Sequence, residues 1–165
     1  FVRVYGFAGS KNRYVLLQTT GLLDEVDARL VNEIDIPDYE RNIPGRLEHT
    51  FEFQAPAGAL IRQLTIQDLH IDHSWLPDLR VSANWNGVER AILWNQQGDA
   101  EGQDGGEDDD DLPFSGADID FDERDYNGFA GLPATGTFTL VIEDRIPGDG
   151  GRLTALDVRV DYLLP

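Results

Sequence analysis

The sequence contains no cysteine, and Lys11 is its only lysine. Without cysteine the chain has no disulfide, no thiolate nucleophile and no cysteine-ligated zinc. No apolar run approaches the roughly 18 residues that cross a bilayer as a helix, so we expect no membrane insertion. Acidic residues number 31 against 13 basic ones, and the resulting net charge of −18 repels nucleic acid and anionic lipid. Thiol chemistry is excluded, and nucleic acid and membranes are poor candidates as partners.

What the sequence does contain is enough apolar material for one folded domain. Hydrophobic residues make up 41% of its 165 residues and aromatic residues 10%. A chain of this length buries roughly 70% of its unfolded surface, so it needs neither a disulfide nor a metal to fold. Because the first residue is Phe1, we expect a processed or excised piece, and a missing signal peptide then says nothing about location.

Apolar residues alternate with polar ones along most of the chain, which is the period of a half-buried strand. The parity of this alternation changes between Ile66 and Leu69, and one extra residue near Gln67–Asp68 explains the change as a β-bulge. Only 21–34 could instead form a helical turn or a linker with a strand. Strands are predicted around 51–53, 64–66, 69–75, 79–85, 88–94, 138–142 and 156–162, separated by turn-forming clusters. The predicted fold class is all-β, an antiparallel β-sandwich.

Two histidines, two aspartates and a serine lie close together in the segment 69–81. In a strand, His70, Asp72 and Ser74 share one face, where side chains two residues apart are about 7 Å from each other. They reach hydrogen-bonding distance only by leaning, and catalytic triads draw their members from separate segments. We therefore predict a solvated polar face. His73 lies on the opposite, apolar face, so we predict a core histidine bonded to a backbone or carboxylate group.

The segment 99–125 carries 13 of the acidic residues and only one base, Arg124. Adjacent carboxylates repel one another within the Debye length of roughly 8 Å, and calcium neutralises such a set by accepting 6–8 oxygen ligands. An EF-hand loop beginning at Asp118 fails, since Glu123 and Phe129 stand where glycine and glutamate are needed. A solvated acidic segment is the alternative to a calcium site. The candidate calcium ligands are Asp78, Asp108, Asp109, Asp110, Asp111, Asp118, Asp120 and Asp122.

Several segments resemble the P-domain (P/Homo B domain) that follows the catalytic domain of kexin- and furin-type proprotein convertases and of bacterial secreted subtilisin-like proteases. The resemblance covers roughly 34–164 and rests on the segments 34–38, 69–79, 125–144 and 148–160. Pro77 stands where the family usually has glycine. The residues that carry the family motif are His73, Trp75, Asp78, Gly136, Phe138 and Asp144, accompanied by Ile71, Leu79, Phe129, Gly131, Thr137, Leu140 and Ile142.

The resemblance implies a sandwich of jelly-roll type that is not itself an enzyme. Such a domain packs on an adjacent protease domain of the parent protein, stabilises it and tunes its dependence on calcium and pH. It also implies a secreted or extracellular protein, and we expect a monomer. The segment 1–17 resembles the last hairpin of a bacterial pre-peptidase C-terminal domain. The expected organisation is a terminal hairpin at 1–20, a linker at 21–33 and the P-domain-like sandwich at 34–165.

A carbohydrate- or surface-binding sandwich module is the alternative function. Exposed aromatic rings on one face would form its stacking platform. Trp85 is the best candidate, because it lies near the turn at 84–87. The other aromatic residues considered for such a platform are Trp75, Trp94, Tyr126 and Tyr162. For each of these residues, core packing is the interpretation that we favour.

Overall fold

The computed structural model describes residues 23–95, 118–121, 124–148 and 150–164. Strands are the main secondary structure of this part of the chain, as predicted, and two short 3-10 helices accompany them. None of its helices is long and apolar enough to cross a membrane. In chain order the elements are β1 (Leu23–Arg29), β2 (Ile34–Ile36), β3 (Gly45–Phe53), β4 (Leu60–His73), η1 (Leu76–Asp78), β5 (Leu79–Trp85), β6 (Val88–Asn95), β7 (Asp118–Phe121), β8 (Arg124–Tyr126), η2 (Asn127–Phe129), β9 (Gly136–Asp144) and β10 (Gly151–Leu163).

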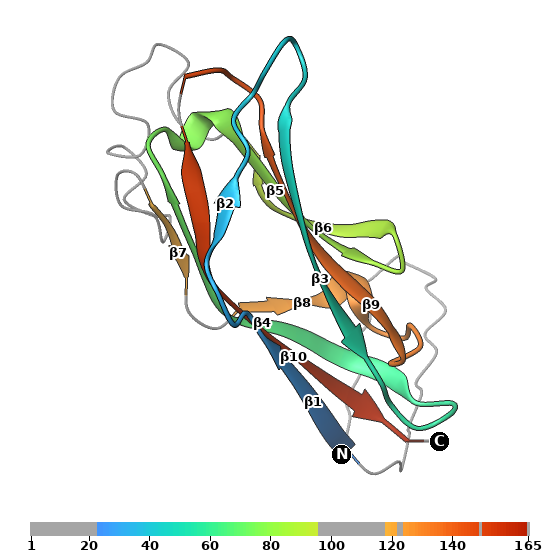
Figure 1. The fold of residues 1–165 in the computed structure, drawn as a ribbon. Coiled ribbons are helices and arrows are strands. Elements are labelled where there is room, and N and C mark those ends of the chain that lie inside the picture. Colours follow the sequence, from blue (N-terminus) through green and yellow to red (C-terminus); the bar gives the residue numbers. More distant parts are fainter. Residues whose placement is uncertain (1–22, 96–117, 122–123, 149, 165) are drawn as a thin grey trace, which may run out of the picture.

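The strands form two antiparallel sheets that pack face to face (Figure 1). One sheet has the order β1-β10-β4-β7, with β2 paired to β10 and β8 paired to β4. The other has the order β3-β9-β5-β6. Strands that follow one another in the chain, such as β3 and β4 or β9 and β10, mostly lie in different sheets. The fold is therefore the all-β sandwich that the sequence predicts.

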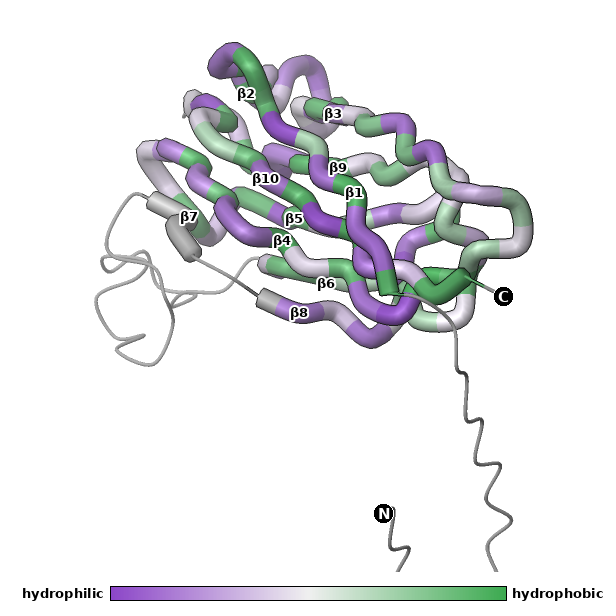
Figure 2. Tube along the Cα trace, turned by 90° about the horizontal axis from the view of Figure 1, so that it is seen from below, coloured by the Kyte–Doolittle hydropathy of each residue, from purple (hydrophilic) through white to green (hydrophobic). Residues whose placement is uncertain are grey.

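The core lies between the two sheets and is rich in aromatic rings. Polar and apolar residues alternate along β4 and β10, as the change of colour along both strands in Figure 2 shows. Trp85 stacks on Phe53 with 5.8 Å between ring centroids, and Phe129 meets the indole edge-on at 6.4 Å. All three side chains are buried. A sandwich needs one apolar face on each sheet, and this alternation supplies both.

The predicted bulge is present in β4. The pairing with β10 shifts so that Ile66 and Asp68 face adjacent residues of β10, which leaves Gln67 as the extra residue. As a result Ile66 and Leu69, three positions apart, both point into the core and are fully buried. The bulge thus keeps a long strand apolar on one face although its sequence changes parity.

The first described strand corrects the expected domain boundary. Residues 21–33 were predicted as a linker, but Leu23–Arg29 form β1 and pair with β10 from Leu23 opposite Leu163 to Arg29 opposite Asp157. Arg29 also forms an ion pair with the Asp157 carboxylate. These residues belong to the sandwich because backbone pairing ties them to it along the whole strand. The terminal hairpin expected at 1–20 lies outside the described residues.

Candidate functional site

Two residues of the family motif, His73 and Asp144, meet inside one end of the sandwich. His73 ends β4, Asp144 ends β9, and both side chains are completely buried. His73 Nε2 lies 3.5 Å from Asp144 Oδ2. Its Nδ1 faces the backbone of Trp75, 2.9 Å from the carbonyl oxygen and 3.1 Å from the nitrogen. The prediction of a core histidine that contacts backbone and carboxylate groups is confirmed.

The environment of Asp144 favours its protonated form. Burial raises the pKa of the Asp144 carboxyl above its ordinary value, and the nearby charge of Asp38 adds to the rise. The backbone N–H of Ile146, 3.3 Å from Oδ1, and the His73 ring act in the opposite direction. Asp78 is buried as well. Its backbone carbonyl accepts a hydrogen bond, 3.0 Å long, from the backbone N–H of Arg145, the residue that follows Asp144. His73, Asp78 and Asp144 are therefore all closed to solvent.

The polar face of β4 is solvated, but its side chains are closer than their spacing suggests. His70 Nε2 lies 2.8 Å from Asp72 Oδ1, so these two side chains do lean together. The hydroxyl of Ser74 contacts the backbone of Gly150 in the β9–β10 connection at 3.4 Å. His70 and Asp72 form a pair on the surface, with side-chain exposures of 33% and 54%. The Ser74 side chain therefore contacts the β9–β10 connection, whereas His70 and Asp72 contact each other. The three residues are not arranged as a catalytic triad.

Trp85 is a core residue and not the stacking platform of the alternative function. Its exposure is 1%, and Phe53 and Phe129 occupy two sides of the indole. The alternation that begins at Leu79 continues unbroken to the end of β5, so Trp85 faces inward even beside a turn. Trp94 is equally buried and donates its indole N–H to the Leu76 carbonyl at 3.0 Å. Neither indole has a face free for a sugar ring.

Gly136 and Phe138 of the family motif complete this aromatic core. A Cβ atom on Gly136 would lie 2.9 Å from the Trp85 ring and 2.7 Å from Asn86 Oδ1, so the backbone approaches the indole more closely than a side chain allows. Phe138 is fully buried and packs 6.4 Å from Phe129. Both motif residues therefore serve packing.

The predicted calcium ligands are only partly within the described chain. Residues 108–111 and 122 lie outside it. Asp118 and Asp120 are in the short strand β7, where they pair with Asp72 and His70 of β4. Asp78 is buried at the end of η1. In the part of the chain that the structure describes, no group of three or more histidine, aspartate or glutamate side chains is arranged to hold a metal ion.

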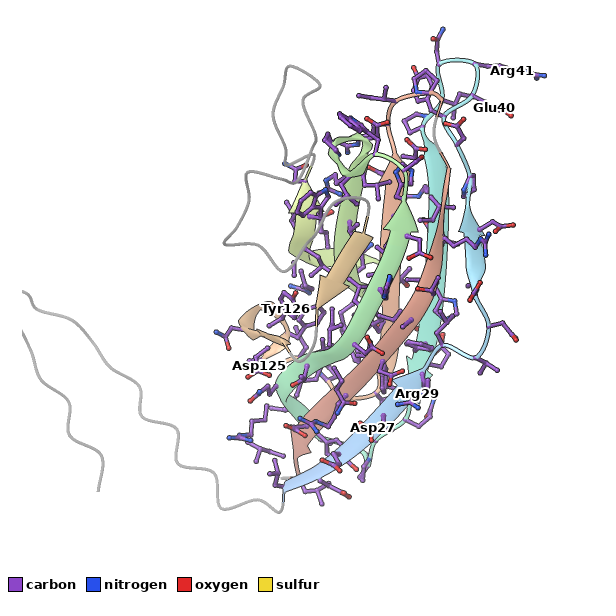
Figure 3. The ribbon with its side chains drawn as sticks, turned by 90° about the vertical axis from the view of Figure 1, so that its left-hand side faces the viewer. Asp27, Arg29, Glu40, Arg41, Asp125 and Tyr126 are labelled. Atoms are coloured by element: carbon purple, nitrogen blue, oxygen red, sulfur yellow. The ribbon has the colours of Figure 1, made fainter. Side chains whose placement is uncertain are left out.

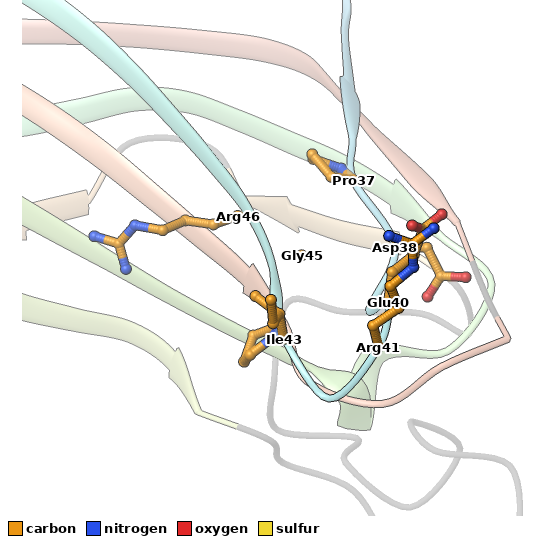
Figure 4. A pocket seen from close by; sticks show the side chains of 8 residues that line it. Pro37, Asp38, Glu40, Arg41, Ile43, Gly45 and Arg46 are labelled. Carbon is orange, nitrogen blue, oxygen red and sulfur yellow. The ribbon is translucent and has the colours of Figure 1, made fainter.

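Two hollows lie along the flank formed by β1, β2 and β3. The first, of about 450 Å³, lies within the loop from Pro37 to Arg46 (Figure 4). At the tip of this loop Arg41 and Asn42 have φ values of 52° and 65°, a left-handed conformation that is costly for residues other than glycine. The second, of about 310 Å³, lies between the β1–β2 connection and β3. His70, Asp72 and Ser74 line neither hollow.

Comparisons with known proteins show a fold and no family. No protein-family model and no curated protein matches the chain. A solved structure of the Aeromonas sobria serine protease in complex with the chaperone ORF2 matches 90% of this chain at 19% identity, with a TM-score of 0.59. A second structure, of the A. sobria serine protease, matches 87% at 19% identity with a TM-score of 0.49. This chain spans 28% of the matched chain in each case. The first match shows a fold shared with one part of a longer chain.

Proposed function

We propose that this chain is a non-catalytic accessory domain of a secreted bacterial protein, attached to a subtilisin-like serine protease domain that it stabilises. The observation that carries the proposal is the match of nearly the whole chain to part of a serine protease chain. The P-domain resemblance supports the same assignment from the sequence. Inter-domain interfaces of this kind bury about 600–1,500 Å², which one face of a sandwich can provide.

The positions of the motif residues support a structural role over catalysis. His73 and Asp144 are closed to solvent, and Gly136 and Phe138 pack around the indole of Trp85. General acid–base catalysis needs titratable groups that can reach a substrate. On the exposed face of β4, His70 and Asp72 form a surface pair. The buried residues His73 and Asp144 contact each other where β4 and β9 end.

Calcium binding remains a proposal that rests on the acidic segment 99–125. The described residues do not form a metal site by themselves. Thermal unfolding of the chain in excess calcium and then in EDTA tests the idea. A ligand present at 100 times its dissociation constant stabilises the folded state by about 2.7 kcal/mol, so a bound ion raises the midpoint by several degrees. Equal midpoints in the two conditions would remove calcium from the proposal.

The accessory role is tested in the parent protein, by comparing the full-length protease with a form that lacks residues 23–165. We expect the shortened protease to inactivate faster on heating and to be processed less completely. Adding back the separate domain serves as the control for expression effects. Full stability and processing without the domain would refute the proposal, and hydrolysis of protease substrates by the isolated domain would refute its non-catalytic character.

A further inference from the structure

β3 presents a free strand edge at the flank of the sandwich. It is the terminal strand of its sheet and, among the described strands, pairs with β9 alone. About half of its backbone N–H and C=O groups therefore point away from the sheet. β1, the terminal strand of the other sheet, runs along the same flank, where Figure 3 labels Asp27 and Arg29. The backbone of Pro37 and Asp38 lies against the first residue of β3, Gly45, so the open part of the edge begins after it. An open strand edge is a template for another strand.

The smaller hollow opens beside this edge. Its wall consists of the β1–β2 connection on one side and the middle of β3 on the other. Thr50 points outward, because its hydroxyl lies 3.2 Å from that of Thr139 on the exposed face of the sheet. Since Thr50 also lines the hollow, the hollow reaches the strand edge. The lining includes the apolar residues Leu30, Val31, Ile34 and Phe51.

The packing along this flank is incomplete. The inward-facing side chains in the middle of β3, His49 and Phe51, are only half-buried, and Val31 is 87% exposed. The His49 ring meets Phe51 edge-on at 4.8 Å. Its Nε2 atom is buried and has no hydrogen-bond partner among the described residues. Burial lowers the pKa of His49 below its ordinary value.

The flank carries a negative charge, which determines the charge of a strand that can bind there. The residues 23–36 and 45–53 contain seven carboxylates and two arginines. Both arginines already have carboxylate partners, Arg29 with Asp157 and Arg46 with Glu48 and Glu143. A second copy of this chain, with its net charge of −18, is repelled from such an edge. A basic segment is attracted to it.

We propose that the free edge of β3 binds an extended, basic segment of a partner protein as an added strand. One apolar side chain of the segment enters the hollow beside Val31 and Phe51. Main-chain hydrogen bonds supply affinity in this mode, and the hollow and the acidic rim supply selectivity. This inference goes beyond the accessory role and stands without it, since it concerns the flank alone.

The probe is a fluorescein-labelled nine-residue peptide of alternating lysine and valine with a central serine, measured by fluorescence anisotropy with the whole chain. We expect saturable binding that protects the amides of β3 from hydrogen exchange. Two counterparts, N-methylated at the odd or at the even residues, serve as controls, because one of them cannot donate its main-chain hydrogens to β3. Equal binding of all three peptides would show simple charge attraction and overturn the proposal, as would no binding at all.

Variants of the protein locate the site. Val31→Ser removes an exposed apolar side chain and is expected to weaken binding by about tenfold. Ile92→Ser is the matched control, since Ile92 is 53% exposed on β6, the opposite edge of the same sheet. Equal affinities for Val31→Ser and Ile92→Ser, or a dimer that Val31→Ser dissociates, would overturn the assignment.

Discussion

Replacing Trp85 by alanine tests whether this residue is a core residue or a ligand platform. The side chain is 1% exposed and contacts the rings of Phe53 and Phe129. Truncating a buried tryptophan to alanine costs about 3–5 kcal/mol. Domains of this kind have a total stability of about 5–15 kcal/mol, so the variant loses a large share of it. At about 2–4 °C per kcal/mol for a domain of this size, the melting temperature falls by roughly 6–20 °C.

A second substitution at the same position sharpens the test. The Trp85 indole N–H is buried and has no hydrogen-bond partner among the described residues, a situation that costs about 1–3 kcal/mol. Trp85→Phe removes that N–H while it leaves a smaller ring in contact with Phe53. The gain from the removed N–H offsets the loss of packing, so we expect this variant to lie within about 1.5 kcal/mol of the original protein.

The assay is urea unfolding followed by far-ultraviolet circular dichroism, which does not depend on the tryptophan that is removed. An unchanged dependence of the unfolding free energy on urea would show that only stability has changed. Ile92→Ala, at an exposed position, is the control and is expected to change stability by less than about 0.5 kcal/mol. A loss below about 1 kcal/mol for Trp85→Ala would refute the buried position of the indole and reopen the carbohydrate-binding alternative.

Two further predictions concern the ends of the strands. Gly136→Ala places a methyl group 2.9 Å from the Trp85 ring and is expected to lower the free energy of unfolding by about 1–3 kcal/mol. Gly150→Ala is the control, because the space around Gly150 is open, and it is expected to leave the melting temperature unchanged. Equal effects of the two substitutions would contradict the close approach of Gly136 to the indole. Because burial raises the pKa of Asp144 above 3.8, the folded chain holds this proton more tightly than the unfolded chain, and stability falls as pH rises from 3.8 through the folded pKa. Asp144→Asn is expected to weaken this dependence of the unfolding free energy on pH, measured by urea titrations at a series of pH values. Asp72→Asn, at an exposed position, is the control. An unchanged pH dependence for Asp144→Asn would refute the raised pKa of Asp144.

Local patterns were sufficient to predict most of the longer strands and the fold class. Alternation identifies a strand from the residues within it, and the change of parity between Ile66 and Leu69 was enough to locate the bulge at Gln67. His73 was predicted correctly for the same reason, because it shares a face with Leu69 and Ile71. Each of these conclusions depends on neighbours in the chain.

Where the predictions were wrong, the deciding contact came from a distant segment. The alternation of 23–29 is weak because most side chains of β1 are exposed, and only its pairing with β10, more than 120 residues away, makes it part of the sandwich. Trp85 lies near a turn and was therefore the best exposed candidate for the alternative function, but Phe53 and Phe129 arrive from other elements and cover it. Nothing in the sequence beside His49 indicates a hollow, since its two walls come from different sheets.

The amino-acid sequence by itself determined that this chain folds as an acidic all-β sandwich without thiol chemistry, because composition and strand period are local properties. Only the tertiary structure decided which polar residues are closed to solvent and which edge is left open. His73 and Asp144 are 71 residues apart in the chain and meet because β4 and β9 end at the same side of the core. The free edge of β3 exists because the sheet ends there, and the position of a strand within a sheet is set by its partners across space.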